Sequence, residues 1–141
     1  MSDTLQYVAD RIALMDVMLK YAKGVDERDL DLYRSVFADD VEVVGFGASV
    51  FHGGDAWTAY VRQALLQYGP TQHMLGPQLA TIDGDTAHCR TDVQAHHYMK
   101  DKPDTTLTLW ATYVTDMQRI GGTWKIKRHQ LHSRGTRVQA G

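Results

Sequence analysis

The sequence predicts an α+β fold in which three helices pack on a strongly curved, mostly antiparallel sheet. Apolar residues recur at helical spacing in the first half of the chain and at every second position in the second half. Glycine-containing turns separate the alternating segments, as expected for long hairpins. Helices and hairpins segregated in this way predict a cone-shaped barrel that encloses a pocket, a usual place for a small molecule.

The first helix is expected over residues 4–23, with Gly24 as its C-terminal stop. A helix that is apolar over much of its circumference is expected to be packed on more than one side. This helix has two neighbouring apolar stripes. One comprises Leu5, Val8, Ile12, Met15, Leu19 and Ala22, and the other comprises Leu14, Met18, Tyr21 and Val25.

Two shorter helices follow the first. One is expected over residues 30–37, behind an Asp29 cap. The other opens at Gly53-Gly54 with Asp55 as its cap. It is expected to end at Gly69-Pro70, because proline cannot continue a helix.

The other periodic segments have the composition of strands. They are expected over residues 41–44, 49–52, 71–82, 85–99, 105–117 and 123–133. Asp83-Gly84 is a strong hairpin signal, and Gly121-Gly122 turns the last hairpin. Residues 1–134 are therefore expected to form a single domain, and the polar residues 135–141 a flexible tail.

The composition is typical of a globular domain that needs no metal or disulfide to fold, with 141 residues, of which 43% are hydrophobic. The net charge of −2 gives no electrostatic case for binding nucleic acid or an anionic membrane. No apolar stretch is long enough to span a membrane. The single cysteine, Cys89, and an N-terminus without a signal-peptide pattern indicate a cytoplasmic protein.

Asp26 follows Gly24 and Val25, where one apolar helix gives way to another. Taken alone, it is most simply a turn residue in water. The surrounding stretch GVDERDLDLYRSVFADDVEV, the stretch GGTWKIKR and the order of elements resemble the nuclear transport factor 2-like superfamily. More narrowly, they resemble its SnoaL-like branch, which includes scytalone dehydratase, bile-acid 7α-dehydratase and hexachlorocyclohexane dehydrochlorinase.

The resemblance implies a catalytic site. Asp26 and His73 match an Asp after the first helix and a His on the strand after the third helix, which the lyases of this branch share. Histidine suits the removal of a carbon-bound proton, and a carboxylate on its other ring nitrogen fixes the tautomer. Tyr21 matches a Tyr of the dehydratases, where it would polarise a carbonyl or donate to the departing oxygen.

His97 is the first candidate for contact with the substrate. The dehydratases place a polar or His residue on the long strand after the catalytic His, and His96 or His97 matches it. Strand alternation favours His97, because it shares the apolar face. Some family members add an Arg from the last strand or tail, which Arg128 or Arg134 would match.

Met18 and Trp110 are candidates for the apolar wall of the pocket, with core packing as their alternative role. The two closely spaced histidine pairs, His96-His97 and His129 with His132, predict no metal site, because the side chains of each pair point to opposite faces of a strand. No cofactor motif occurs in the chain, so no cofactor is expected.

The function favoured by these residues is a cofactor-independent lyase of the dehydratase type, acting on a small hydrophobic, cyclic molecule. Two alternatives stay open: a protein that binds such a ligand without turning it over, and an isomerase or cyclase that uses the same pocket. A partly apolar second face of the sheet predicts a homo-oligomer, and the resemblance favours a trimer, with a dimer as the alternative.

Overall fold

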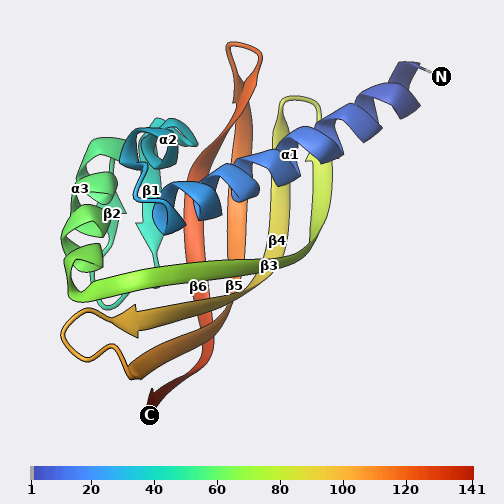
Figure 1. Cartoon of the computed structure of the whole chain (residues 1–141). Coiled ribbons are helices and arrows are strands. Elements are labelled where there is room, and N and C mark those ends of the chain that lie inside the picture. Colours follow the sequence, from blue (N-terminus) through green and yellow to red (C-terminus); the bar gives the residue numbers. More distant parts are fainter. Residues whose placement is uncertain (1) are drawn as a thin grey trace.

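The computed structural model describes residues 2–141 and confirms the α+β architecture. Three helices pack on a curved sheet of six strands whose spatial order is β2-β1-β6-β5-β4-β3 (Figure 1). The helices are α1 (Ser2–Asp26), α2 (Leu30–Ser35) and α3 (Gly54–Ala64). The strands are β1 (Phe37–Val44), β2 (Phe51–His52), β3 (Tyr68–Asp83), β4 (Thr86–Met99), β5 (Thr105–Ile120) and β6 (Thr123–Ala140).

The curvature of the sheet brings its far edge back under the helices. β3 to β6 form three successive antiparallel hairpins, and β6 then pairs in parallel with β1. β3 is irregular between Leu75 and Gln78, and such a bulge bends a strand. In Figure 1, β3 bends there and passes beneath the C-terminal part of α1. This crossing positions the candidate site.

Gly24 does not end the first helix, contrary to the sequence-based expectation. α1 continues to Asp26, and the chain then turns through Arg28, whose φ is 58°. A Cβ on Gly24 would lie 2.8 Å from the backbone nitrogen of Tyr33 in α2. Gly24 therefore allows the close approach of two helices, and its lack of a side chain is a packing requirement rather than a helix stop.

The expected ends of the two shorter helices also shift. α2 stops at Ser35, because Phe37 already belongs to β1. Its Asp29 cap is confirmed, since the Asp29 side chain accepts a hydrogen bond from the backbone of Leu32. Gly53, not Asp55, is the cap of α3.

Gly69-Pro70 does not end the third helix, because a short 3-10 turn over residues 65–67 ends it first. The dipeptide lies in β3, an edge strand, where a proline without an N–H is tolerated. β6 likewise runs past the expected end at residue 133, because residues 135–140 pair with the start of β5. The segment expected to be a loose tail is thus a strand held by its backbone, with exposed side chains that give no alternating pattern.

One of the two apolar stripes of α1 is buried throughout, and Ala22 is the single buried residue of the other. Leu14, Met18, Tyr21 and Val25 belong to the core. Leu5 and Ile12 of the other stripe are 72% and 61% exposed, so α1 is not packed on two sides in this chain. Figure 1 shows the reason: the N-terminal part of α1 projects beyond the strands. The homo-oligomer stays a prediction.

No helix within residues 2–141 is both long enough and apolar enough to cross a membrane.

Candidate functional site

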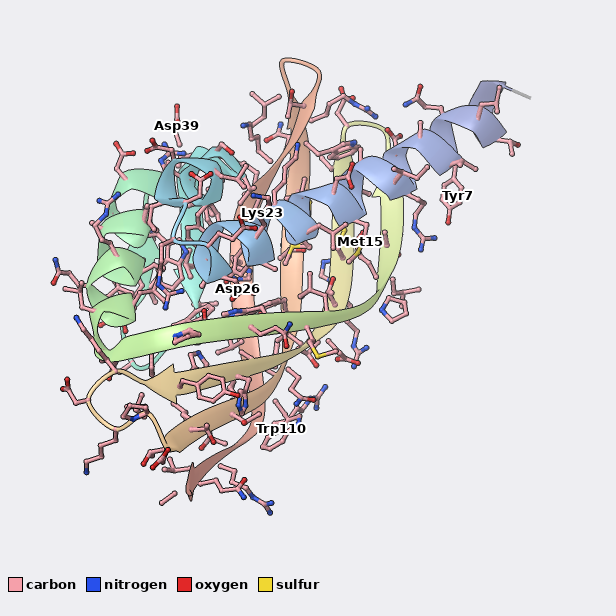
Figure 2. The ribbon with its side chains drawn as sticks, viewed as in Figure 1. Tyr7, Met15, Lys23, Asp26, Asp39 and Trp110 are labelled. Atoms are coloured by element: carbon pink, nitrogen blue, oxygen red, sulfur yellow. The ribbon has the colours of Figure 1, made fainter. Side chains whose placement is uncertain are left out.

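The last residue of α1 and the first half of β3 meet where the two elements cross. Asp26 Oδ1 lies 2.7 Å from His73 Nδ1, and Asp26 Oδ2 accepts a hydrogen bond from the His73 backbone nitrogen at 2.8 Å. The Thr71 hydroxyl also donates to Asp26 Oδ1, at 3.0 Å. The two side chains that the resemblance pairs therefore touch, although 47 positions separate them. Asp26 is labelled in Figure 2, between α1 and β3.

The surroundings of Asp26 keep it ionised. Burial raises the pKa of Asp26, but the hydrogen bonds from the ring and backbone of His73 outweigh burial and hold that pKa below its ordinary value. An ionised carboxylate only accepts hydrogen bonds, so Nδ1 of His73 carries the proton. Nε2 of neutral His73 is then left with a lone pair, and it makes no hydrogen bond to any residue between 2 and 141. The exposed fractions of the two side chains are 9% for His73 and 20% for Asp26.

His97 lies beside this pair, as strand alternation predicts. Its ring centroid is 5.9 Å from that of His73 and 4.6 Å from that of Tyr68. Its Nδ1 donates to the backbone carbonyl of Leu107 at 3.0 Å, so its Nε2 also has a lone pair when the ring is neutral. Burial lowers the pKa of His97, which favours the neutral ring.

Tyr21 occupies a different part of the core. Its hydroxyl lies 2.8 Å from Nε2 of His129, and it forms no hydrogen bond with Asp26 or His73. The aromatic rings of Tyr33, Tyr113 and His129 surround it, with centroids 4.9 to 5.2 Å away. Burial raises the pKa of Tyr21 well above its ordinary value, so the phenol keeps its proton.

His129 contacts the candidate Tyr21 but is not among the site residues expected from the sequence. Its side chain is fully buried, and burial lowers its pKa to about 3. Its Nδ1 has no hydrogen-bond partner among the residues that the structure describes. The ring of Tyr113 lies 4.9 Å from that of His129 and 5.2 Å from that of Tyr21, and burial raises the pKa of Tyr113.

The remaining candidates for substrate contact do not join these groups. Met18 is fully buried in the core, on the same stripe of α1 as Tyr21. Trp110 does not line the pocket, contrary to the sequence-based expectation. It lies opposite Gln94 on the outer face of the sheet and is 39% exposed. In Figure 2 it lies well apart from Asp26, below the curved strands.

The two arginine candidates also lie away from the expected position beside the substrate. Arg128 lies opposite Asp116 in the register of β5 and β6, on the outer face, and its guanidinium lies 3.5 Å from the Glu42 carboxylate. Arg134 donates to the hydroxyl of Thr112 on the same outer face. His96 also faces outward, where it contacts the side chain of Thr108. Trp110, Arg128 and Arg134 were assigned to the site by resemblance or by apolar character, and the strand register places them on the opposite face. His96 lies on the outer face, as strand alternation predicts.

Comparison with known proteins gives a family and a fold. A family model described as a SnoaL-like domain matches residues 6–130. No curated protein matches significantly. Two solved structures from Novosphingobium aromaticivorans are similar. One, provisionally named a scytalone dehydratase, is 22% identical with a TM-score of 0.87, over 100% of this chain and 95% of that one. The other, provisionally named an aromatic ring hydroxylase, is 25% identical with a TM-score of 0.84. This match covers 95% of this chain and 94% of that one.

A third similar structure is a hexachlorocyclohexane dehydrochlorinase from Novosphingobium barchaimii. It is 20% identical to this chain, with a TM-score of 0.87, and the match covers 98% of this chain and 95% of that one. Structures named for two different eliminations and for a hydroxylation thus share this fold. The fold alone does not select among these reactions.

Proposed function

This chain belongs to the SnoaL-like domain family, and on that premise we propose that it is a cofactor-independent lyase that eliminates water from a small hydrophobic, cyclic molecule. The observation that carries the proposal is the hydrogen bond between Asp26 and His73, which leaves Nε2 of His73 without a hydrogen bond to any residue from 2 to 141. Two of the similar structures are named for eliminations, which supports the same reaction class.

In the proposed reaction, His73 is the base. Its Nε2 takes a proton from the carbon next to a carbonyl, the electron pair of that C–H bond forms the double bond, and the C–O bond to the leaving hydroxyl breaks. Asp26 stabilises the imidazolium that forms, because its carboxylate accepts a hydrogen bond from Nδ1 of His73. The departing oxygen leaves as water when it takes up the proton that His73 Nε2 removed from the carbon, and this transfer returns the imidazole to its neutral form.

Tyr21 and His97 are proposed to form hydrogen bonds with the polar groups of the substrate. Tyr21 would polarise the carbonyl or donate to the departing oxygen, and its bond to His129 would hold the hydroxyl in place. If Nε2 of His129 donates to the phenol oxygen, the phenol proton is released for a ligand. His97, with its neutral ring next to His73, would accept a hydrogen bond from a substrate hydroxyl.

The test is a panel of cyclic β-hydroxyketones incubated with the protein and analysed by mass spectrometry. We expect a product lighter by one water, and loss of that product by at least about 100-fold on His73→Gln. His88→Gln is the matched control, because His88 also binds an aspartate, Asp116, at 2.6 Å, but this pair is 61% and 48% exposed on the outer face. Equal losses in both variants would reject the role of His73.

The same panel separates the two alternative functions. A substrate that is bound without any change in mass or retention time supports a ligand-binding protein. A product of unchanged mass but altered retention time supports an isomerase or cyclase.

A further inference from the structure

A pocket of about 290 Å³ is lined in part by Arg28, two residues after Asp26. Three cations and four apolar or aromatic side chains line it, and they are Arg28, Arg62 and Lys100 with Leu30, Leu65, Leu66 and Tyr68. Among the residues that the structure describes, no Asp or Glu contributes to the wall of this pocket. A cavity with this lining combines a positive potential with an apolar surface.

The positive charge of the pocket is not neutralised by its neighbours. Within residues 2–141, neither Arg62 nor Lys100 has a carboxylate within ion-pair distance. The Arg28 guanidinium donates to the backbone carbonyls of Val25 and Gly69 and to the Thr71 hydroxyl. These partners are uncharged, so the guanidinium is fixed in position but keeps its charge.

Two routes connect the pocket to the candidate catalytic residues. In the first, Arg28 donates to Thr71 at 2.9 Å, and Thr71 donates to Asp26 at 3.0 Å. In the second, Tyr68 in the pocket wall packs on His97, whose ring lies 5.9 Å from that of His73. A ligand that fills the pocket and extends past Tyr68 would therefore approach His97 first and then His73.

Arg28 adopts a backbone conformation that L-residues rarely occupy, with φ of 58°. Strain of this kind is retained where the surrounding structure requires it, and it is concentrated at functional positions. Here it turns the chain directly after Asp26 and directs the Arg28 side chain along the wall of the pocket.

We propose that this pocket binds the anionic group of an amphipathic ligand, so that the substrate class is a hydrophobic carboxylate. The carboxylate would lie between Arg62, Lys100 and Arg28. The apolar body would extend along Leu65 and Tyr68 toward His97 and His73. This inference rests on the proposed function for the identity of the site, but it makes a separate statement about binding.

The experiment compares two probes of the same shape by isothermal titration calorimetry. Naphthoate carries the anion, and naphthamide is its neutral counterpart. We expect the wild-type protein to bind naphthoate about threefold to tenfold more tightly, because partly exposed cations contribute modestly to binding. The double variant Arg62→Gln/Lys100→Gln should lose this preference and keep its affinity for naphthamide. Both side chains are exposed, so the fold should be retained, and circular dichroism checks this.

Arg137→Gln is the control, because Arg137 is an exposed cation on β6, paired with Thr108 of the outer face. Three results would overturn the proposal: no naphthoate binding up to millimolar concentration, equal affinity for both probes, or an equal loss of preference in Arg137→Gln. His73→Gln should keep the preference for naphthoate over naphthamide, because His73 does not line the cationic pocket. Its loss of turnover with intact anion binding would separate a failure of the lyase proposal from a failure of this one.

Discussion

The hydroxyl of Tyr21 and Nε2 of His129 lie 2.8 Å apart in the centre of the core, on elements separated by 108 positions in the sequence. Both residues are buried, and three aromatic rings enclose the pair, those of Tyr33, Phe37 and Tyr113. A polar contact of this kind is costly to break, because each partner would be left buried without water. The pair therefore links α1 to β6 as well as fixing the Tyr21 hydroxyl.

Removing both partners of the pair should cost less than the sum of the two single removals. We expect Tyr21→Phe and His129→Leu each to lower the free energy of unfolding by about 1–3 kcal/mol, because each leaves a buried polar atom unpaired. The double variant should cost less than the sum, with a coupling energy of about 1–2 kcal/mol. Urea unfolding of the four proteins measures this cycle, and strictly additive losses would show that the two side chains do not interact.

The low pKa of His129 should make stability depend on pH. Burial lowers this pKa from 6.5 to about 3 in the folded chain. Between these two pH values the unfolded chain binds a proton at His129 and the folded chain does not, so stability falls as the pH falls. The loss approaches about 1.4 kcal/mol per pH unit for one proton.

The double variant Tyr21→Phe/His129→Leu lacks the imidazole that binds this proton. Its free energy of unfolding should decline less steeply than that of the wild type between pH 6 and 4, which urea unfolding at several pH values measures. Parallel curves for the two proteins would mean that His129 is protonated in the folded state.

The outline of the fold could be predicted from the sequence, because turn chemistry and periodicity are local properties. Asp83-Gly84 and Gly121-Gly122 do turn hairpins, and Asp29 does cap its helix. The end of the first helix could not be predicted in this way. Gly24 has the composition of a stop, but its role is set by the approach of Tyr33 from another helix.

The candidate site was predictable only where a resemblance supplied the partner. No local pattern links Asp26 to His73, because their contact depends on the crossing of α1 and β3. Trp110 was misplaced because both faces of its strand are half-apolar, so alternation alone does not tell which one the helices cover. His129 was missed because of a bulge in β6: Ile126 and His129 are both fully buried although three positions apart, which a regular strand would forbid.

Asp26 should contribute stability that disappears in acid. Its folded pKa lies below the ordinary value of 3.8, so the contribution is present above about pH 4 and is lost as the pH falls through the folded pKa. We expect Asp26→Asn to lower the free energy of unfolding by about 1–2 kcal/mol at pH 7, and by less at pH 3. Asp31→Asn, a change at an exposed residue of α2, is the control. A deficit that stays constant across this range would show that the hydrogen bonds to Asp26 do not depend on its charge.

The N-terminal half of α1, which projects beyond the strands, should depend on one buried ion pair. Asp10 is buried and accepts two hydrogen bonds from Arg119 at 2.9 and 3.1 Å, while the Arg119 guanidinium lies over the Trp124 ring. The hydrogen bond from Arg119 lowers the pKa of Asp10, so the carboxylate is charged at neutral pH. Asp10→Asn should lower the free energy of unfolding by about 2–3 kcal/mol, because it removes the buried one of the two carboxylates that bind Arg119.

Asp85 provides a matched comparison, because it binds the same guanidinium at 3.0 Å but is 74% exposed. Asp85→Asn should cost less than about 1 kcal/mol, as is usual for surface ion pairs. Hydrogen exchange would locate the effect: in Asp10→Asn, protection should fall in residues 3–12 before it falls in the strands. Equal destabilisation by the two substitutions would mean that the Arg119 charge, rather than the burial of Asp10, determines how strongly α1 is held to the hairpin of β5 and β6.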